Sequence, residues 1–187
     1  MNYSECIENA RTRIGNYCKA CPECNGRACK NQMPGPGAKG IGDTAIRNYD
    51  KWKEIRVQMD TIVENKPVDT SLELFGKKFL YPFFAGPVGA VGLHYGDCLD
   101  DVRYNDILVS ACAKYGIAAF TGDGLDSNVM VAATKAIGKT DGIGIPTVKP
   151  WNIDTVAEKM KMVQESKAFA VAMDVDAAGL PFLKNME

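Results

Sequence analysis

The sequence contains no long apolar run, no cluster of basic residues and only one histidine in 187 residues. A membrane-spanning helix needs about 20 consecutive apolar residues, and no stretch of this chain approaches that length. The formal net charge is −1, and without a basic patch nothing indicates a nucleic-acid partner. The N-terminal residues lack the charged-then-apolar pattern of an export signal. We therefore expect a cytoplasmic protein that binds neither membrane nor nucleic acid.

Composition indicates a folded domain of ordinary size. Hydrophobic residues make up 46% of the chain and charged residues 24%, which is typical of soluble globular proteins. A chain of this length is able to bury a substantial apolar core. The composition thus excludes a disordered chain and is compatible with a small-molecule enzyme.

Cysteine is abundant but unevenly placed, since five of the seven cysteines lie within the first 30 residues. In a reducing compartment a local cysteine cluster points to metal or redox chemistry rather than to a disulfide framework. The spacing C-x2-C-x2-C-x4-C resembles zinc and iron–sulfur ligand runs without matching a standard pattern of either. The predicted ligands are Cys18, Cys21, Cys24 and Cys29. A redox or structural thiol cluster, or no role at all, are the alternatives.

Two regions of different character follow each other along the chain. Residues 1–45 form a cysteine-rich and then glycine-rich arm, which we predict to be a loop or extended segment because glycine and proline recur in it. Residues 46–187 form the predicted folded domain. Tyr49, Trp52 and Ile55 follow each other at helical spacing, and two short apolar strips at 72–74 and 78–80 predict a small β-hairpin.

The rest of the chain alternates short apolar runs with helical patterns. The runs lie at 83–85, 117–120, 143–145 and 169–173, and helices are predicted over 101–115, 127–137 and 154–166. Such alternation predicts parallel strands in an α/β fold. An open dinucleotide-binding sheet would carry a Gly-x-Gly-x-x-Gly turn after its first strand, whereas this chain has Gly86-Pro87-Val88-Gly89-Ala90. A (β/α)8 barrel is therefore favoured over the open sheet.

The most specific part of the sequence is Asp69-Thr70-Ser71-Leu72-Glu73-Leu74-Phe75-Gly76 followed by Tyr81-Pro82-Phe83-Phe84-Ala85-Gly86-Pro87. It resembles the entry to the barrel in the FMN-dependent α-hydroxy-acid dehydrogenase and oxidase family. The segment from Asn48 to Asp60 is similar to that family's pre-barrel helix and its exit. This resemblance implies a partial TIM (β/α)8 barrel comprising about the first four β/α units, preceded by the arm, the helix and the hairpin.

The resemblance also implies which residues would meet the cofactor FMN. In the family, the backbone after the first strand lies against the flavin, and polar side chains after the next three strands bind the polar edge of the ring. The corresponding residues here are Gly86, Pro87, Val88, Gly89, Thr121, Thr147 and Asp174. Thr147 and Asp174 replace the usual glutamine and threonine, which implies an altered flavin environment. Lys149 replaces a substrate-facing tyrosine, so it is the predicted substrate contact.

No residue of this chain is predicted to be the catalytic base. The family's base lies in a Ser-Asn-His-Gly-Gly motif late in the barrel, and neither this motif nor the late phosphate-binding site occurs before Glu187. His94 lies on the loop after the first strand, where a surrogate base is one interpretation and a local hydrogen bond the other. Four parallel strands leave two unpaired edges, so we expect completion by a C-terminal half or pairing of two copies, and an inactive fragment alone.

The predicted function is that of the N-terminal part of an oxidoreductase that transfers a hydride from a small 2-hydroxy acid to FMN. Two alternatives stay open at this point. One is a cysteine-metal module, with zinc or an iron–sulfur cluster, on a barrel scaffold without hydroxy-acid activity. The other is a flavin-dependent isomerase or synthase on the same barrel.

Overall fold

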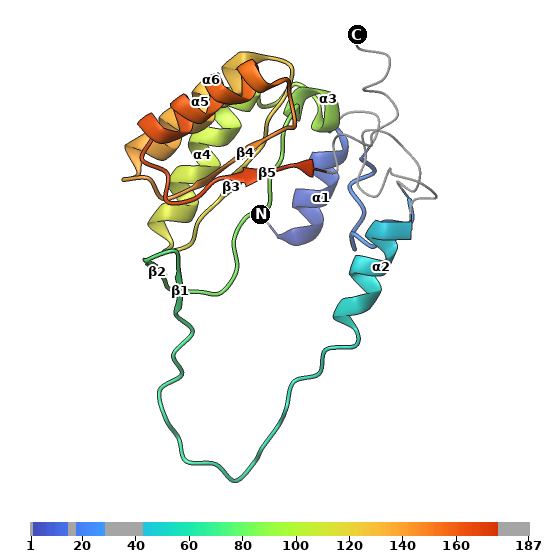
Figure 1. Cartoon of the computed structure of the whole chain (residues 1–187). Coiled ribbons are helices and arrows are strands. Elements are labelled where there is room, and N and C mark those ends of the chain that lie inside the picture. The colour runs from blue at the N-terminus through green and yellow to red at the C-terminus, as the bar shows by residue number, and fades with distance from the viewer. Residues whose placement is uncertain (1, 15–17, 29–42, 176–187) are drawn as a thin grey trace. The chain divides into compact units, whose positions relative to one another are not determined.

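The computed structural model describes residues 2–14, 18–28 and 43–175. The chain divides into two compact units, Met1–Val68 with Gly92–Cys98, and Asp69–Val91 with Leu99–Glu187. Its elements are coloured in chain order in Figure 1. No helix within the described residues is long and apolar enough to cross a membrane.

The first unit contains helices α1 (Tyr3–Arg11) and α2 (Asp43–Trp52). Helix α1 lies inside the region predicted to lack regular structure, so that part of the prediction is wrong. The reason is a capping box, in which the Asn2 side chain accepts from the Glu5 backbone N–H and the Glu5 carboxylate accepts from the Asn2 backbone N–H. These reciprocal bonds satisfy amide groups that a short helix otherwise leaves open at its start. The predicted helix near Tyr49 is present as α2 and begins earlier than expected.

The second unit begins with the predicted hairpin, formed by β1 (Leu72–Leu74) and β2 (Lys77–Phe79). The strands are antiparallel, and Phe75 and Gly76 at the turn both have positive φ angles, of 48° and 74°. Two consecutive left-handed residues are what a tight two-residue hairpin turn requires. The hairpin prediction is confirmed.

The core of the second unit is a parallel sheet with helices between its strands. Strands β3 (Phe120–Thr121), β4 (Ile145–Val148) and β5 (Ala172–Met173) pair in the order β3-β4-β5. Ala85 forms a parallel bridge to Ala119, and its amide donates to the Ala118 carbonyl at 3.1 Å. The strand segments therefore lie side by side in the order in which they occur in the sequence.

Each strand starts later than the apolar run predicted for it, and β3 and β5 are also shorter than their runs. Turn residues with positive φ stand shortly before the three runs, namely Gly116 at 72°, Gly142 at 77° and Lys167 at 58°. At the first run only the bridge at Ala85 forms. The parallel α/β class is confirmed, while closure into a barrel stays a prediction.

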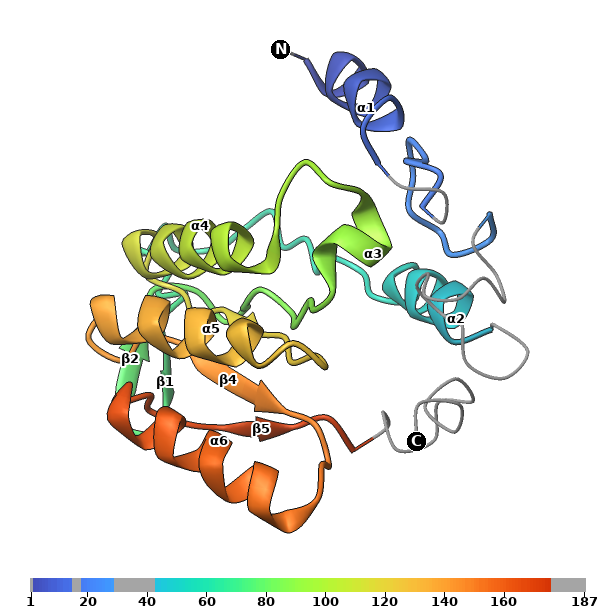
Figure 2. The same cartoon turned by 90° about the horizontal axis from the view of Figure 1, so that it is seen from above.

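Helices α4 (Asp101–Lys114), α5 (Ser127–Lys139) and α6 (Ile153–Glu165) match the three predicted helices within two residues at each end. Each starts with a side-chain cap, from Asp100, Asp126 and Asn152. Figures 1 and 2 show the three helices side by side over one face of the sheet. The short helix α3 (Val91–Tyr95) stands between the first strand position and α4 and contains His94.

Two apolar clusters bind the helices to the sheet. The first joins α4, α5 and the sheet through Val109, Cys112, Ala119, Ala136 and Ile137, and the second joins α5, β4 and α6 through Met130, Val148 and Val163. Burial raises the pKa of the Cys112 thiol, so this cysteine behaves as a core residue rather than a reactive one. These two clusters thus lie between the helices and one face of the sheet.

Ile137 is fully buried in the first cluster, whereas Ile153 at the start of α6 is 78% exposed. We expect Ile137→Ala to lower the free energy of unfolding by about 2–5 kcal/mol, because it leaves a cavity in a packed core. The matched control Ile153→Ala should change it by less than about 0.5 kcal/mol. Urea denaturation followed by circular dichroism measures both, and equal effects of the two substitutions would contradict this placement of the core.

Candidate functional site

The carboxyl ends of the parallel strands meet at one rim of the second unit. Thr121 ends β3, Lys149 follows β4, and Asp174 follows β5, with its amide donating to the Val148 carbonyl at 2.9 Å. In α/β folds the residues at this end of the strands form the binding site, because loops from several strands converge there. The rim brings together the predicted residues of three separate strands.

Strand pairing decides which face of the sheet each rim residue occupies. Thr121 pairs with Pro146, and Thr147 pairs with Ala172. Successive residues of a strand point to opposite faces. Ala119 and Val148 pack against the helices, so Thr121 shares the helix-facing side and Thr147 lies on the side turned away from the helices. The two threonines, predicted as equivalent flavin contacts, thus occupy different faces.

Both threonines carry a buried hydroxyl without a hydrogen-bond partner. Within the described part of the chain, Thr121 Oγ1 and Thr147 Oγ1 are two of three buried side-chain polar atoms in this situation, the third being Asn105 Oδ1. An unpaired buried hydroxyl costs free energy comparable to a lost hydrogen bond. At Thr147 this unpaired hydroxyl lies on the side of the sheet turned away from the helices.

Lys149 and Asp174 form an ion pair at the same rim. The Lys149 ammonium lies 2.9 Å from Asp174 Oδ2, and the two side chains keep 23% and 32% of their exposure. Continued alternation puts both residues on the same face as Thr147. A predicted substrate contact and a predicted flavin contact are therefore direct neighbours, and a ligand at this rim meets a cation, a carboxylate and a hydroxyl.

The loop after the first strand position lies directly against the loop after β3. A Cβ atom built on Gly122 would stand 2.3 Å from the Val88 carbonyl oxygen, and one built on Gly89 would stand 2.7 Å from the Asp123 carbonyl oxygen. Distances this short exclude any side chain at either glycine. Gly86, in contrast, has open space where a Cβ would be. The loop after the first strand position is thus held against the β3 loop at Gly89, whereas its backbone at Gly86 has open space beside it.

Asp123 is a buried residue that the sequence analysis did not single out. Its Oδ1 accepts from Lys159 Nζ at 2.6 Å and from the Gly124 amide at 2.9 Å. Its Oδ2 accepts from the Trp151 indole N–H at 2.7 Å and from the Lys149 amide at 2.9 Å. The side chain is fully buried, and that of Lys159 is 8% exposed. One carboxylate therefore joins the loops after β3 and β4 to helix α6.

A signal for this cluster exists in the sequence but is weak. Lys159 is a lysine among the apolar positions of α6, between Val156 and Val163. A lysine on the buried side of a helix requires an acidic partner. The sequence does not identify which aspartate that is, because the partner is 36 residues away.

The cysteine-rich loop belongs to the first unit. Arg11 Nε donates to the Ala20 carbonyl at 3.3 Å, the Tyr3 hydroxyl donates to the Pro22 carbonyl, and the Tyr49 hydroxyl bonds to Glu23. The hydrogen bond to Glu23 is the main cause that raises the pKa of Tyr49. The loop is thus held by side chains of both α1 and α2.

Cys18, Cys21 and Cys24 are free thiols in this loop, and Cys29 lies outside the described residues. Across residues 2–14, 18–28 and 43–175, no group of three or more histidine, cysteine or acidic side chains is arranged to hold a metal ion. The four-cysteine site therefore stays a prediction.

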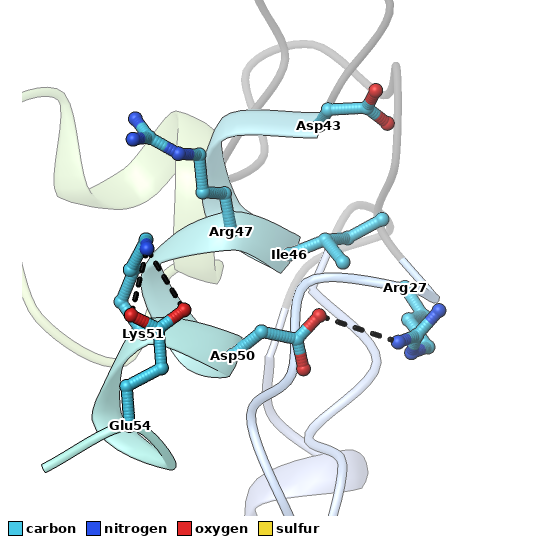
Figure 3. Close-up of a pocket in the computed structure, with 7 residues that line it drawn as sticks. All are labelled: Arg27, Asp43, Ile46, Arg47, Asp50, Lys51 and Glu54. Atoms are coloured by element: carbon cyan, nitrogen blue, oxygen red, sulfur yellow. Dashed lines mark hydrogen bonds and ion pairs between the residues drawn. The ribbon is translucent and has the colours of Figure 1, made fainter.

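An open hollow in the first unit differs in chemical character from the predicted flavin contacts. It has a volume of about 530 Å³ and is lined by Arg27, Asp43, Ile46, Arg47, Asp50, Lys51 and Glu54 of the first unit. Figure 3 shows that its charged groups pair with one another, Arg27 with Asp50 and Lys51 with Glu54. These charged groups are exposed and already paired, so this hollow is a weaker candidate for the flavin site than the rim of the second unit.

The Asp123–Lys159 pair should contribute strongly to stability because both charges are buried. Asp123→Ala leaves the Lys159 ammonium buried without its carboxylate, and we expect the free energy of unfolding to fall by about 3–5 kcal/mol. Asp106→Ala is the matched control, since it breaks the Lys139–Asp106 pair, which has a similar distance of 2.7 Å but is half exposed. That change should cost less than about 1 kcal/mol. Chemical denaturation tests both, and similar losses would show that burial of the Asp123 pair is unimportant.

Comparison with known proteins gives one clear result. Comparison with curated sequences yields no significant match. The sequence profile of the family described as FMN-dependent dehydrogenase matches residues 35–183. The matched range contains the hairpin, the parallel strands and all the rim residues described above, and it spans most of the chain. The resemblance inferred from the barrel-entry segment is therefore confirmed, and the chain belongs to the FMN-dependent dehydrogenase family.

Proposed function

We propose that this chain supplies the first four β/α units of a flavin-dependent oxidoreductase that oxidises a small 2-hydroxy acid. Family membership supports the flavin oxidoreductase class and FMN as the cofactor. The single observation that carries the site is the unpartnered, buried Thr147 hydroxyl beside the Lys149–Asp174 ion pair. These groups lie at the strand ends, where ligands of parallel α/β folds bind.

The residues of the rim suit the polar edge of a flavin ring. The Thr147 hydroxyl can donate to or accept from a ring heteroatom, and the Lys149 ammonium can donate to a carbonyl or carboxylate oxygen. The near end of the Gly86–Gly89 loop permits close approach of a flat ring, because no side chain projects from Gly86. When bound, FMN supplies the acceptor for the hydride equivalent. The chain's own residues bind and orient it.

Two charged residues of the rim, Lys149 and Asp174, are suited to binding the substrate. A 2-hydroxy acid carries a carboxylate, and Lys149 is the cation on the helix-free face of the rim. We propose that Lys149 binds that carboxylate, while Asp174 holds the ammonium in place through their 2.9 Å ion pair. The base that removes the substrate proton is expected from the second half of the barrel.

The sheet order supports the barrel part of this proposal. The strands are parallel, follow sequence order and carry their three helices on one face, which is how consecutive units of a (β/α)8 barrel are arranged. Strand β5 pairs only with β4 among the described residues. We propose that a second half, on the same or another chain, pairs with this edge in the cytoplasm.

Flavin binding is tested with the Thr147→Val and Thr121→Val variants. We expect FMN to bind the unsubstituted chain with quenching of its fluorescence, and Thr147→Val to weaken binding about 10-fold through loss of one hydrogen bond to the ring. Thr121→Val, which removes a hydroxyl from the helix-facing side, should change the dissociation constant less than about 2-fold. No saturable quenching by the unsubstituted chain would contradict the proposed function. The opposite ranking of the variants would contradict the assignment of faces.

A cysteine-bound metal is a second candidate, supported by the way α1 and α2 hold the cysteine-rich loop. A loop that is already held by hydrogen bonds loses less conformational entropy when its thiolates gather around an ion. We expect zinc or iron in protein purified without oxygen, and its loss in Cys21→Ser. Cys98→Ser is the control, because Cys98 is an exposed thiol outside the loop. Elemental analysis decides, and a metal-free unsubstituted protein removes this candidate.

A further inference from the structure

The Asp123 carboxylate differs from an ordinary buried carboxylate in its position between loops of the rim. It lies two residues after the end of β3, and each of its oxygens accepts two hydrogen bonds. Structural ion pairs in a core commonly join helices or strands. This one instead joins the two loops that lead into the proposed flavin site.

One of its four partners is the backbone of Lys149. The Lys149 amide donates to Asp123 Oδ2 at 2.9 Å, while the Lys149 ammonium pairs with Asp174 at 2.9 Å. The same carboxylate oxygen accepts from the Trp151 indole at 2.7 Å. The main chain before and after Pro150 is therefore fixed relative to β3. This fixes the direction in which the Lys149 side chain leaves the rim.

The other side of Asp123 is fixed by its own backbone. Its carbonyl oxygen lies 2.7 Å from the position that a Cβ on Gly89 would take, and a Cβ on the neighbouring Gly122 would stand 2.3 Å from the Val88 carbonyl oxygen. The loop after the first strand position cannot move toward the loop after β3 without a clash. Three of the rim loops thus depend on the position of one residue.

We propose that Asp123 is a positioning residue for flavin binding, which fixes the Lys149 loop against the β3 loop through its two carboxylate oxygens. This inference rests on the proposed function, since it assumes that the rim receives FMN. It assigns no contact between Asp123 and the cofactor, because Asp123 follows Thr121 on the helix-facing side of the sheet.

Lys159 allows positioning to be separated from stability. Replacing a buried ion pair by groups of similar volume is often neutral for folding, whereas removing one partner is not. We therefore compare two double variants, Asp123→Asn with Lys159→Met and Asp123→Leu with Lys159→Met. Neither contains the buried ammonium. Asparagine keeps one acceptor oxygen for the Lys149 amide and the Trp151 indole, and leucine keeps none.

The experiment measures the FMN dissociation constant by fluorescence quenching, together with the thermal unfolding midpoint. We expect the asparagine double variant to bind within about 3-fold of the unsubstituted chain, and the leucine double variant to bind at least about 10-fold more weakly while still folded. A purely structural role predicts instead that affinity follows the unfolding midpoint in both.

Trp151→Phe is the second variant, in case the leucine double variant does not fold. It keeps an aromatic ring at this position and removes the indole donor to Asp123, together with part of the ring volume. We expect a 2- to 5-fold weaker affinity for FMN, smaller than that of the leucine variant because the Lys149 amide keeps its acceptor.

The outcomes separate this inference from the proposed function. If the unsubstituted chain does not bind FMN, the proposed function and this inference are both wrong. If the unsubstituted chain binds FMN and the folded leucine double variant binds it equally well, this inference alone is wrong. If the leucine double variant is unfolded, unchanged affinity of Trp151→Phe overturns the inference in the same way.

Discussion

One buried carboxylate holds the rim of the second unit together. Asp123 accepts hydrogen bonds from four donors that come from its own loop, from the loop after β4 and from α6. A buried ionised group is stable only when it is paired and hydrogen-bonded, because water no longer solvates it. The four donors therefore stabilise the carboxylate, and the same hydrogen bonds fix the positions of the loops that carry the donors.

The rest of the rim follows from this constraint. With the loops after β3 and β4 fixed, the side turned away from the helices presents the Thr147 hydroxyl and the Lys149–Asp174 pair. The opposite side is filled by the two apolar clusters that bind the helices. The sheet therefore separates a packed face from a polar face, and membership of a flavin-dependent family gives the polar face its proposed ligand.

The sequence predicted the elements that depend on local patterns. The three long helices were found because their apolar residues recur at helical spacing and polar caps precede them, as Asn152 does before α6. The hairpin was found because Phe75-Gly76 separates two apolar strips. Helix α1 was missed because the cysteine and glycine content of the arm outweighed the short capping signal of Asn2 and Glu5.

The candidate site was predictable only in part. The rim positions followed from the family resemblance, but the assignment of faces needed strand pairing, which shifts Thr121 and Thr147 to opposite sides. The importance of Asp123 depends on Lys159, which is 36 residues away. A contact between residues so far apart produces no helical or strand periodicity, so a single sequence does not predict it.

The facing glycines at 89 and 122 restrict how this part of the chain is able to change. Each lies so close to the backbone of the other loop that even a methyl group is excluded. The two positions are therefore coupled, because a side chain at either one would require the loops to separate and the donors of Asp123 to move with them. Variation that alters ligand preference is consequently directed to positions such as 147, 149 and 174, whose side chains lie on the side of the sheet turned away from the helices.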